Sequence, residues 1–174
     1  MKRSEINAAI EHAKGLLVKY RISLPQFGYL TLDGWRRGGV DHSRIAETML
    51  GWDVTDFGSG NFARVGATLF TLRNGVVGKP GVGTPYAEKY IIMDGRGQEI
   101  PFHYHIKKTE DIINRAGAKL VIQVYNAAPD NTLDLCSRPE LWLDGVLRRF
   151  DPGELIALEP GQSITLTPYI YHRF

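Results

Sequence analysis

The pattern of apolar and polar positions changes near Phe57. Before that point apolar residues recur three or four positions apart, a spacing typical of amphipathic helices. It predicts a helix over residues 4–20, capped by Ser4, and a second helix from about residue 42 to residue 50. The stretch between them, residues 22–35, contains proline and glycine and is expected to be extended or irregular.

After Phe57, glycine and proline interrupt short apolar runs about every ten residues, a rhythm typical of antiparallel strands in a sandwich or barrel. Asn74-Gly75 and Asp144-Gly145 are the strongest turn signals. No helical pattern alternates with the runs, which argues against a parallel α/β sheet. The predicted strands cover residues 67–72, 86–93, 119–125, 141–143, 146–148, 155–158 and 163–167.

These elements predict a mainly β protein with one structural domain. A helical arm over residues 1–57 would pack on an antiparallel barrel or double sheet over residues 58–174. The 174 residues, of which 43% are apolar, are enough for one domain with a real core and too few for two of ordinary size.

Composition and charge exclude several classes of function. Lysine and arginine number 21 against 19 acidic residues and form no long block, so neither nucleic acid nor a membrane is the expected partner. No apolar run approaches the roughly 18 residues of a membrane span, and the N-terminus lacks a signal-type apolar region. The single cysteine, Cys136, excludes an internal disulfide framework and fits a reducing, cytoplasmic compartment.

Three histidines and one glutamate form a candidate metal site. His103 and His105 are two positions apart, so on a strand over residues 100–105 both rings project from the same face. Glu110 follows a predicted turn and can return to the same ion from the next strand, whereas His172 must arrive through the fold. Imidazole and carboxylate together suit manganese, iron, cobalt, nickel or zinc and do not choose among them.

An isolated histidine pair is more often a surface or core feature than a metal site, but this pair belongs to a longer pattern. Gly97, His103, His105, Glu110 and Gly117 are separated by five, one, four and six residues. This spacing resembles the first motif of the cupin superfamily at every position. The resemblance implies a cupin jelly-roll β-barrel that binds a metal.

The second cupin motif is looser, because Pro168 stands four residues before His172, where the family usually has five with a glycine between them. A tighter resemblance covers most of the chain and indicates the cupin-type D-lyxose isomerases. The matching strings are Trp52–Thr55, Thr68–Gly75, Tyr86–Lys89, Glu110–Arg115, Pro160–Ile164 and Tyr171-His172.

This resemblance implies a metal-dependent aldose–ketose isomerase and a homodimer. The implied reactions convert D-lyxose to D-xylulose and D-mannose to D-fructose through an enediol, usually with manganese. Lys89 matches a lysine that the family places at the substrate, where it would assist proton transfer. Family members continue for several dozen residues beyond the last ligand and supply an acidic residue from there, whereas this chain stops at Phe174. We therefore expect either a shortened product or impaired chemistry.

Two alternatives stay open. The same metal geometry serves cupin dioxygenases, in which oxygen occupies an open coordination position. A non-catalytic sugar-binding cupin is the other alternative, and the missing C-terminal segment favours it. Without the resemblance, Lys89 would be interpreted as an exposed strand lysine.

Overall fold

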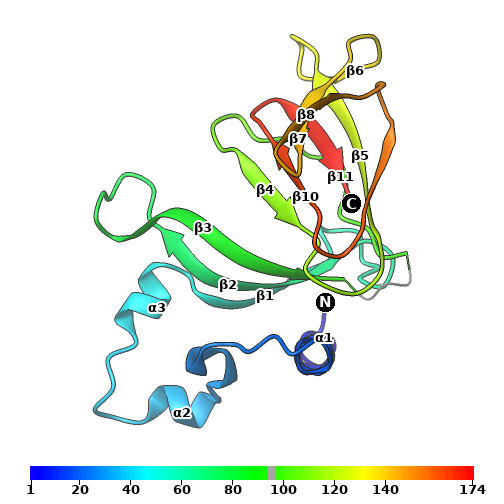
Figure 1. Cartoon of the computed structure of the whole chain (residues 1–174). Coiled ribbons are helices and arrows are strands. Elements are labelled where there is room, and N and C mark those ends of the chain that lie inside the picture. Colours follow the sequence, from blue (N-terminus) through cyan, green and yellow to red (C-terminus); the bar gives the residue numbers. More distant parts are fainter. Residues whose placement is uncertain (94–96) are drawn as a thin grey trace. The chain divides into compact units, whose positions relative to one another are not determined.

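A computed structural model describes residues 1–93 and 97–174, and the chain is mainly β with helices near its N-terminus (Figure 1). The described residues form two compact units, Met1–Gln98 and Glu99–Phe174. The first contains α1 (Arg3–Lys19), η1 (Gln26–Tyr29), α2 (Leu32–Arg36), α3 (Ser43–Glu47), β1 (Gly51–Thr55), β2 (Ala67–Gly75) and β3 (Gly83–Ile92). The second contains β4 (Glu110–Ile113), β5 (Leu120–Ala127), β6 (Leu133–Asp134), β7 (Glu140–Leu143), β8 (Val146–Arg149), β9 (Leu155–Leu158), β10 (Ser163–Leu166) and β11 (Ile170–Arg173). The domain division expected at residue 57 stays a prediction.

The first unit is a three-stranded antiparallel sheet, in the order β1-β2-β3, packed against helical segments. Phe70 of β2 is fully buried and contacts Leu17 of α1 and Leu24. Trp52 of β1 meets the Phe70 ring edge-on, and its indole N–H donates to the Gly28 carbonyl oxygen, 2.8 Å away. The apolar side chains whose spacing predicted the first helix therefore include one, Leu17, that packs α1 against the sheet.

The helix ends differ from those expected. Ser4 lies inside α1, and the N-cap is Lys2, whose N–H donates to the Glu5 carboxylate at 2.5 Å. A glutamate three residues after the cap supplies the acceptor that Ser4 was expected to provide. The stretch expected to be irregular contains the short helical turns η1 and α2, and the second predicted helix is confined to α3. β1 follows the second predicted helix, within the arm over residues 1–57 for which no strand was predicted.

The turn predicted at Asn74-Gly75 is wrong, because β2 continues through this dipeptide. Gly75 pairs with Gly83 of β3, and the hairpin loop lies between these two residues. Glycine permits this close pairing, since a Cβ at position 75 would lie 2.2 Å from the Thr84 carbonyl oxygen. The turn predicted at Asp144-Gly145 is confirmed between β7 and β8, with φ of 48° and 78°.

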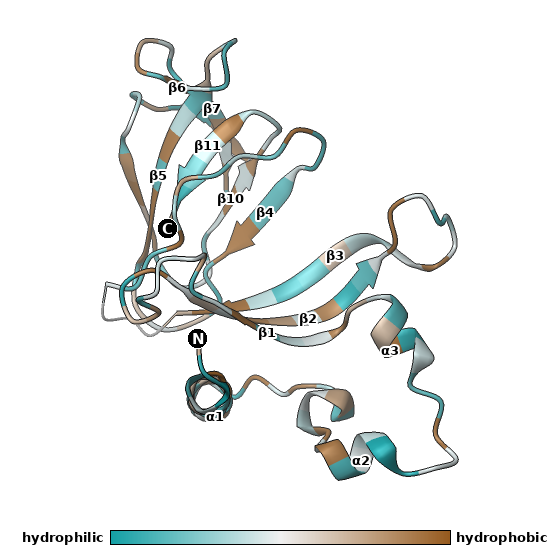
Figure 2. Cartoon of the chain, turned by 180° about the vertical axis from the view of Figure 1, so that it is seen from behind, coloured by the Kyte–Doolittle hydropathy of each residue, from teal (hydrophilic) through white to brown (hydrophobic). Residues whose placement is uncertain are grey.

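The second unit contains two antiparallel sheets that share one core. One sheet has the order β4-β10-β7-β8, and in the other β5 pairs with β11, β6 and β9. Side chains alternate between buried and more exposed along β9, β10 and β11, as a half-buried strand requires. Figure 2 shows the apolar positions along β5. The buried core consists of Ile122, Val124, Leu141, Phe150, Ile156, Leu158, Ile164, Leu166 and Ile170.

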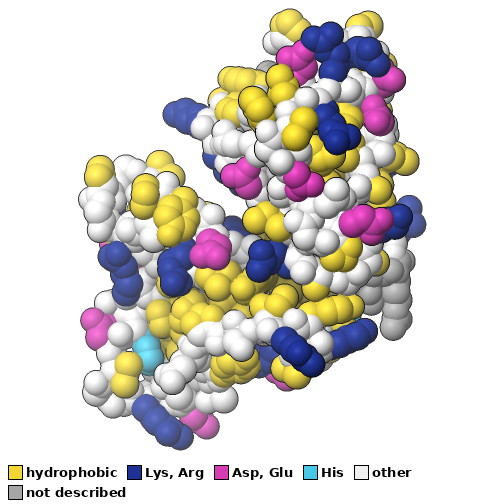
Figure 3. Space-filling model, in the orientation of Figure 1, with side chains coloured by type: hydrophobic (Ala, Val, Ile, Leu, Met, Phe, Trp, Pro, Cys, Tyr) yellow, Lys and Arg dark blue, Asp and Glu magenta, His cyan; other side chains and the backbone are white. Residues whose placement is uncertain are grey.

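The expectation of a mainly β, jelly-roll type of fold with N-terminal helices is confirmed. Within the described ranges the strands form separate sheets and do not close into one barrel. No helix in the described part of the chain is both long and apolar enough to cross a membrane. On the face drawn in Figure 3, basic and acidic side chains are intermixed and do not gather into a block of one sign.

Candidate metal centre

Three segments of the second unit carry the predicted ligands. Glu110 opens β4, His172 lies in β11, and His103 and His105 belong to an extended segment beside β11. The N–H of His103 donates to the His172 carbonyl oxygen at 3.1 Å, and the reverse bond measures 2.9 Å. This segment forms an isolated bridge with β11 and is not the regular strand expected there. Pro101 has no N–H, and the pairing continues beyond it with a shifted register, in which Ile100 and Phe174 exchange backbone hydrogen bonds of 3.0 and 3.3 Å.

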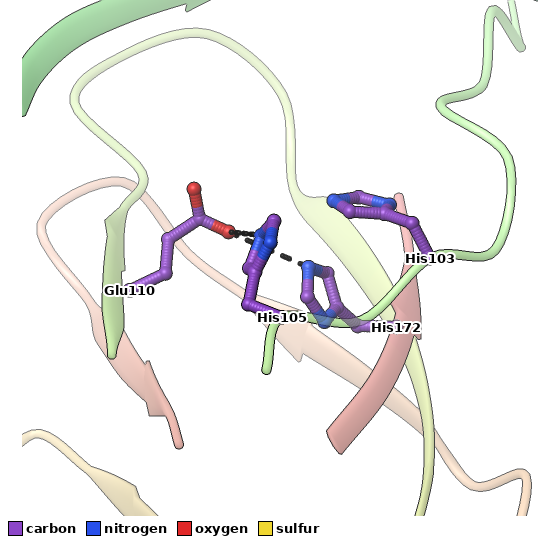
Figure 4. A group of neighbouring side chains, drawn as sticks. All are labelled: His103, His105, Glu110 and His172. Carbon is purple, nitrogen blue, oxygen red and sulfur yellow. Dashed lines mark hydrogen bonds and ion pairs between the residues drawn. The ribbon is translucent and has the colours of Figure 1, made fainter. Parts of the chain in front are cut away.

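The side chains of His103, His105, Glu110 and His172 converge (Figure 4). One ligand atom from each residue lies within 4.8 Å of the others. The ring centroids of His103 and His172 are 4.2 Å apart, and those of His103 and His105 are 5.2 Å apart. His172 is only 1% exposed, whereas the other three are half-buried. The cluster is therefore desolvated at His172, while its other three side chains keep some contact with solvent.

Backbone carbonyl groups orient two of the imidazole rings. The Nδ1 atom of His103 lies 3.0 Å from the Pro101 carbonyl oxygen, and Nδ1 of His172 lies 2.9 Å from that of Ile170. A carbonyl oxygen only accepts hydrogen bonds, so Nδ1 carries the proton in each ring. In the neutral ring the lone pair then resides on Nε2, the atom available to a metal.

Glu110 supplies the negative charge of the cluster. Its Oε2 atom lies 3.3 Å from His105 Nε2 and 3.4 Å from His172 Nε2, and its Oε1 atom lies 3.1 Å from Lys108 Nζ. Burial alone would raise the pKa of this carboxyl group. Contact with His172 and the charge and hydrogen bond of Lys108 outweigh burial and hold the pKa well below its usual range. Glu110 is therefore ionised at neutral pH.

Burial also favours neutral imidazoles. Desolvation lowers the pKa of His103, and desolvation together with the Lys108 charge lowers the pKa of His105. A neutral ring is the form that binds a metal, because protonation blocks the lone pair. The electrostatics of the cluster thus prepare both side chains as ligands.

The atom that best tests the fit of a metal is His172 Nε2. It is buried and has no hydrogen-bond partner among the described residues. A proton on this nitrogen would donate to Glu110 Oε2, 3.4 Å away, and this is the contact that lowers the pKa of Glu110. In the neutral ring with its proton on Nδ1, Nε2 is instead an acceptor that faces another acceptor. A cation between two such atoms removes their repulsion and satisfies both. Three imidazoles and one carboxylate would leave two positions open on an octahedral ion, and this nitrogen and oxygen set suits a divalent transition metal.

Two neighbours of the cluster were not identified from the sequence as part of the site. Lys108 contacts Glu110. The sequence feature that could have predicted this contact is their two-residue spacing, because alternate residues of an extended chain lie on the same side. The Phe174 ring centroid lies 5.5 Å from that of His172 and 6.4 Å from that of His103. The only sequence feature that could have pointed to Phe174 is its position two residues after His172. An aromatic residue at the end of a strand is otherwise a common packing residue.

The predicted catalytic residue lies in the first unit. Lys89 is an exposed residue of β3, where it pairs in register with Thr71 of β2. Beside this pair the register of the two strands shifts, so that Arg73 is opposite Glu88. The role of Lys89 stays a prediction.

The fold and the cluster define a jelly-roll type of protein with a His₃Glu candidate metal centre. A family model described as D-lyxose isomerase matches residues 1–174, and the chain belongs to that family. It is 39% identical over 180 residues to a D-lyxose/D-mannose isomerase of Serratia proteamaculans and 40% identical over 179 residues to one of Escherichia coli O157:H7. Each comparison covers all of this chain and 76% of the relative.

Proposed function

We propose that this chain is a metal-dependent sugar isomerase that interconverts D-lyxose with D-xylulose and D-mannose with D-fructose. Membership of the D-lyxose isomerase family and the names of the two relatives support the reaction. The observation that carries the proposal is the buried Nε2 of His172 facing the Glu110 carboxylate, with His103 and His105 beside them. A divalent metal bound there would polarise the sugar carbonyl and acidify the proton on the adjacent carbon.

The roles of the ligand side chains follow from their geometry. His103 and His172 would bind through Nε2, because Nδ1 of each donates to a backbone carbonyl group. Glu110 would bind through Oε2 while Lys108 holds Oε1. We propose manganese as the ion, on the family resemblance and on a donor set without thiolate. Iron, cobalt, nickel and zinc are the other ions that such a set accepts.

The proton between C1 and C2 of the sugar needs a carrier. We propose Lys89, which matches the family lysine in the string Tyr86–Lys89 and is exposed on β3. A lysine lowers the barrier for proton transfer when its amine lies within hydrogen-bond reach of the reacting carbon or oxygen. Lys89 is not one of the proposed metal ligands, so a substitution of Lys89 should change turnover without changing metal binding.

The remaining proposals concern partners and location. Intermixed surface charge fits an uncharged sugar better than a polyanion (Figure 3). We propose a homodimer, on the family resemblance, and a cytoplasmic location, because Cys136 is a free, exposed thiol.

The test is ketose formation from D-lyxose and D-mannose by the purified chain. We expect D-xylulose and D-fructose to form with added manganese and not after removal of metal by a chelator. An oxygen electrode in the same reaction discriminates against dioxygenase chemistry, which would consume oxygen with an aromatic or thiol substrate. Stoichiometric metal binding without ketose from either aldose would defeat the isomerase proposal and favour a sugar-binding protein without turnover.

A further inference from the structure

Two tyrosines alternate with the candidate ligands along the backbone. Tyr104 stands between His103 and His105, and Tyr171 directly precedes His172. Successive side chains of an extended backbone point to opposite sides, so the two tyrosines face away from the ligand cluster. Their rings lie together there, with centroids 4.5 Å apart. Each tyrosine is thus connected through its backbone to a ligand.

Both tyrosine hydroxyl groups donate to one residue, Asn131, in the loop between β5 and β6. The Tyr104 hydroxyl lies 2.8 Å from Asn131 Oδ1, and the Tyr171 hydroxyl lies 2.5 Å from the Asn131 carbonyl oxygen. Asn131 has a φ of 63°, a left-handed conformation that asparagine adopts more readily than most residues. Its N–H donates to the Ala128 carbonyl oxygen at 2.9 Å, which closes the turn. The loop thus offers one side-chain acceptor and one backbone acceptor to two ligand-bearing segments.

We infer that Tyr104, Tyr171 and Asn131 are positioning residues that fix the spacing of the ligand-bearing segments and thereby strengthen metal binding. This inference rests on the metal centre proposed above. Backbone hydrogen bonds of Ile100, His103 and His105 already join this segment to residues 169–174. The two tyrosine hydroxyl groups add a connection from both segments to the loop between β5 and β6, and this connection limits how far the segments can move relative to each other. Ligands held in their binding geometry before the ion arrives lose less conformational entropy on binding.

The hydroxyl groups can be removed one at a time without changing the rings. We expect Tyr104→Phe and Tyr171→Phe each to weaken metal binding by about 3- to 10-fold, the range of one ordinary hydrogen bond. Tyr169→Phe is the matched control. Its ring stacks on Tyr104, but no hydrogen bond of its hydroxyl is found among the described residues. Competition with a coloured chelator measures the metal affinity, and the visible spectrum of the Co²⁺-loaded protein reports the ligand geometry.

A double-mutant cycle assigns the acceptor. Asn131→Gly retains the left-handed conformation and the backbone acceptor but loses Oδ1. It should weaken metal binding as Tyr104→Phe does, and the combination of the two should add nothing further. Asn131→Gly combined with Tyr171→Phe should instead be additive, because Tyr171 uses the backbone oxygen.

Two outcomes separate this inference from the proposed metal centre. If the wild-type chain binds no stoichiometric metal, both are overturned. If the wild type binds metal and the two tyrosine variants bind it with unchanged affinity and Co²⁺ spectrum, the positioning role alone is overturned. A variant with a lower thermal midpoint of the metal-free protein, but with unchanged affinity and spectrum, would show a purely structural role and also overturn the inference.

Discussion

His172 Nε2 and Glu110 Oε2, from β11 and β4, lie 3.4 Å apart, and the histidine is fully buried. The other ring nitrogen of His172 is bound to the Ile170 carbonyl oxygen, so in the neutral ring two acceptors face each other. A fold that places two such atoms together without a donor requires a cation or a proton between them. The strand pairing of the second unit therefore brings together the donor atoms of the proposed metal centre.

The first prediction concerns the charge of Glu110. Glu110→Gln keeps the shape of the side chain but removes the negative charge. Loss of a residue that only supports a ligand costs about 10- to 100-fold in metal affinity, so the loss of this ligand should cost at least about 100-fold. Elemental analysis after dialysis measures the metal content. Asp111→Asn is the matched control, because Asp111 is the next residue of β4, is exposed, and bonds to Thr165. Equal loss of metal in both variants would contradict the assignment.

A second prediction concerns the stability of the metal-free protein against pH. The pKa of His103 is lowered by burial, so the unfolded chain binds its proton at a higher pH than the folded chain. The contribution of His103 to the free energy of unfolding is therefore fully present above the ordinary histidine pKa of about 6.5. This contribution is lost as the pH falls through the lowered pKa of the folded chain. His103→Asn should flatten the change of thermal midpoint between about pH 7 and pH 5. If the thermal midpoint of the variant falls with pH as steeply as that of the wild type, protonation of His103 is not the cause of the loss of stability.

Metal should also stabilise the fold. An ion that binds only the folded chain adds about 2.7 kcal/mol at a concentration 100 times its dissociation constant. Differential scanning calorimetry should show that Mn²⁺ raises the thermal midpoint of the wild type. The thermal midpoint of His172→Ala should not change when Mn²⁺ is added. A metal-induced rise of equal size in His172→Ala would place the bound ion elsewhere.

The fourth prediction separates Lys89 from metal binding. If Lys89 moves the proton, Lys89→Met should lower kcat by about 10²-fold or more and leave the metal content intact. Lys119→Met is the control, since Lys119 is another exposed lysine, paired with Glu159. Normal turnover by Lys89→Met would remove the lysine from the mechanism.

The core of the second unit gives a prediction about stability. Ile122 of β5 is fully buried, whereas its neighbour Val121 is 43% exposed. Ile122→Ala should lower the free energy of unfolding by about 2–5 kcal/mol through lost burial and a residual cavity. Val121→Ala should cost far less. Urea unfolding followed by tryptophan fluorescence measures both, and equal losses would contradict the assigned orientation of β5.

Much of this structure could be predicted from local sequence. Period-two and turn signals located β5, β9 and the Asp144-Gly145 hairpin, because each of these is decided by neighbouring residues. Asn74-Gly75 failed because pairing with Gly83 across the hairpin outweighs the turn preference of the dipeptide. The strand β1 was missed since its stability comes from pairing with β2, which no local pattern reveals.

In the site, too, residues close together in the sequence could be predicted, whereas contacts between distant segments could not. The spacing of His103, His105 and Glu110 indicated three ligands that lie close in sequence. His172 was named as a candidate ligand in advance, but no local pattern predicted how it reaches the site. Its position depends on the pairing of β11 with the 100–105 segment. The bridge through Asn131 had no sequence signal, because its three residues meet only after β5, β6 and β11 have assembled.

We propose that isomerisation by this chain depends on one metal ion held by His103, His105, Glu110 and His172. The most direct measurement titrates metal-free protein with Mn²⁺ and records D-xylulose formation from D-lyxose at each addition. Activity should rise in proportion to bound metal and reach a plateau at about one ion per chain, as a single four-ligand site requires. Ketose formation by the metal-free protein, or an unchanged titration by Glu110→Gln, would contradict the account.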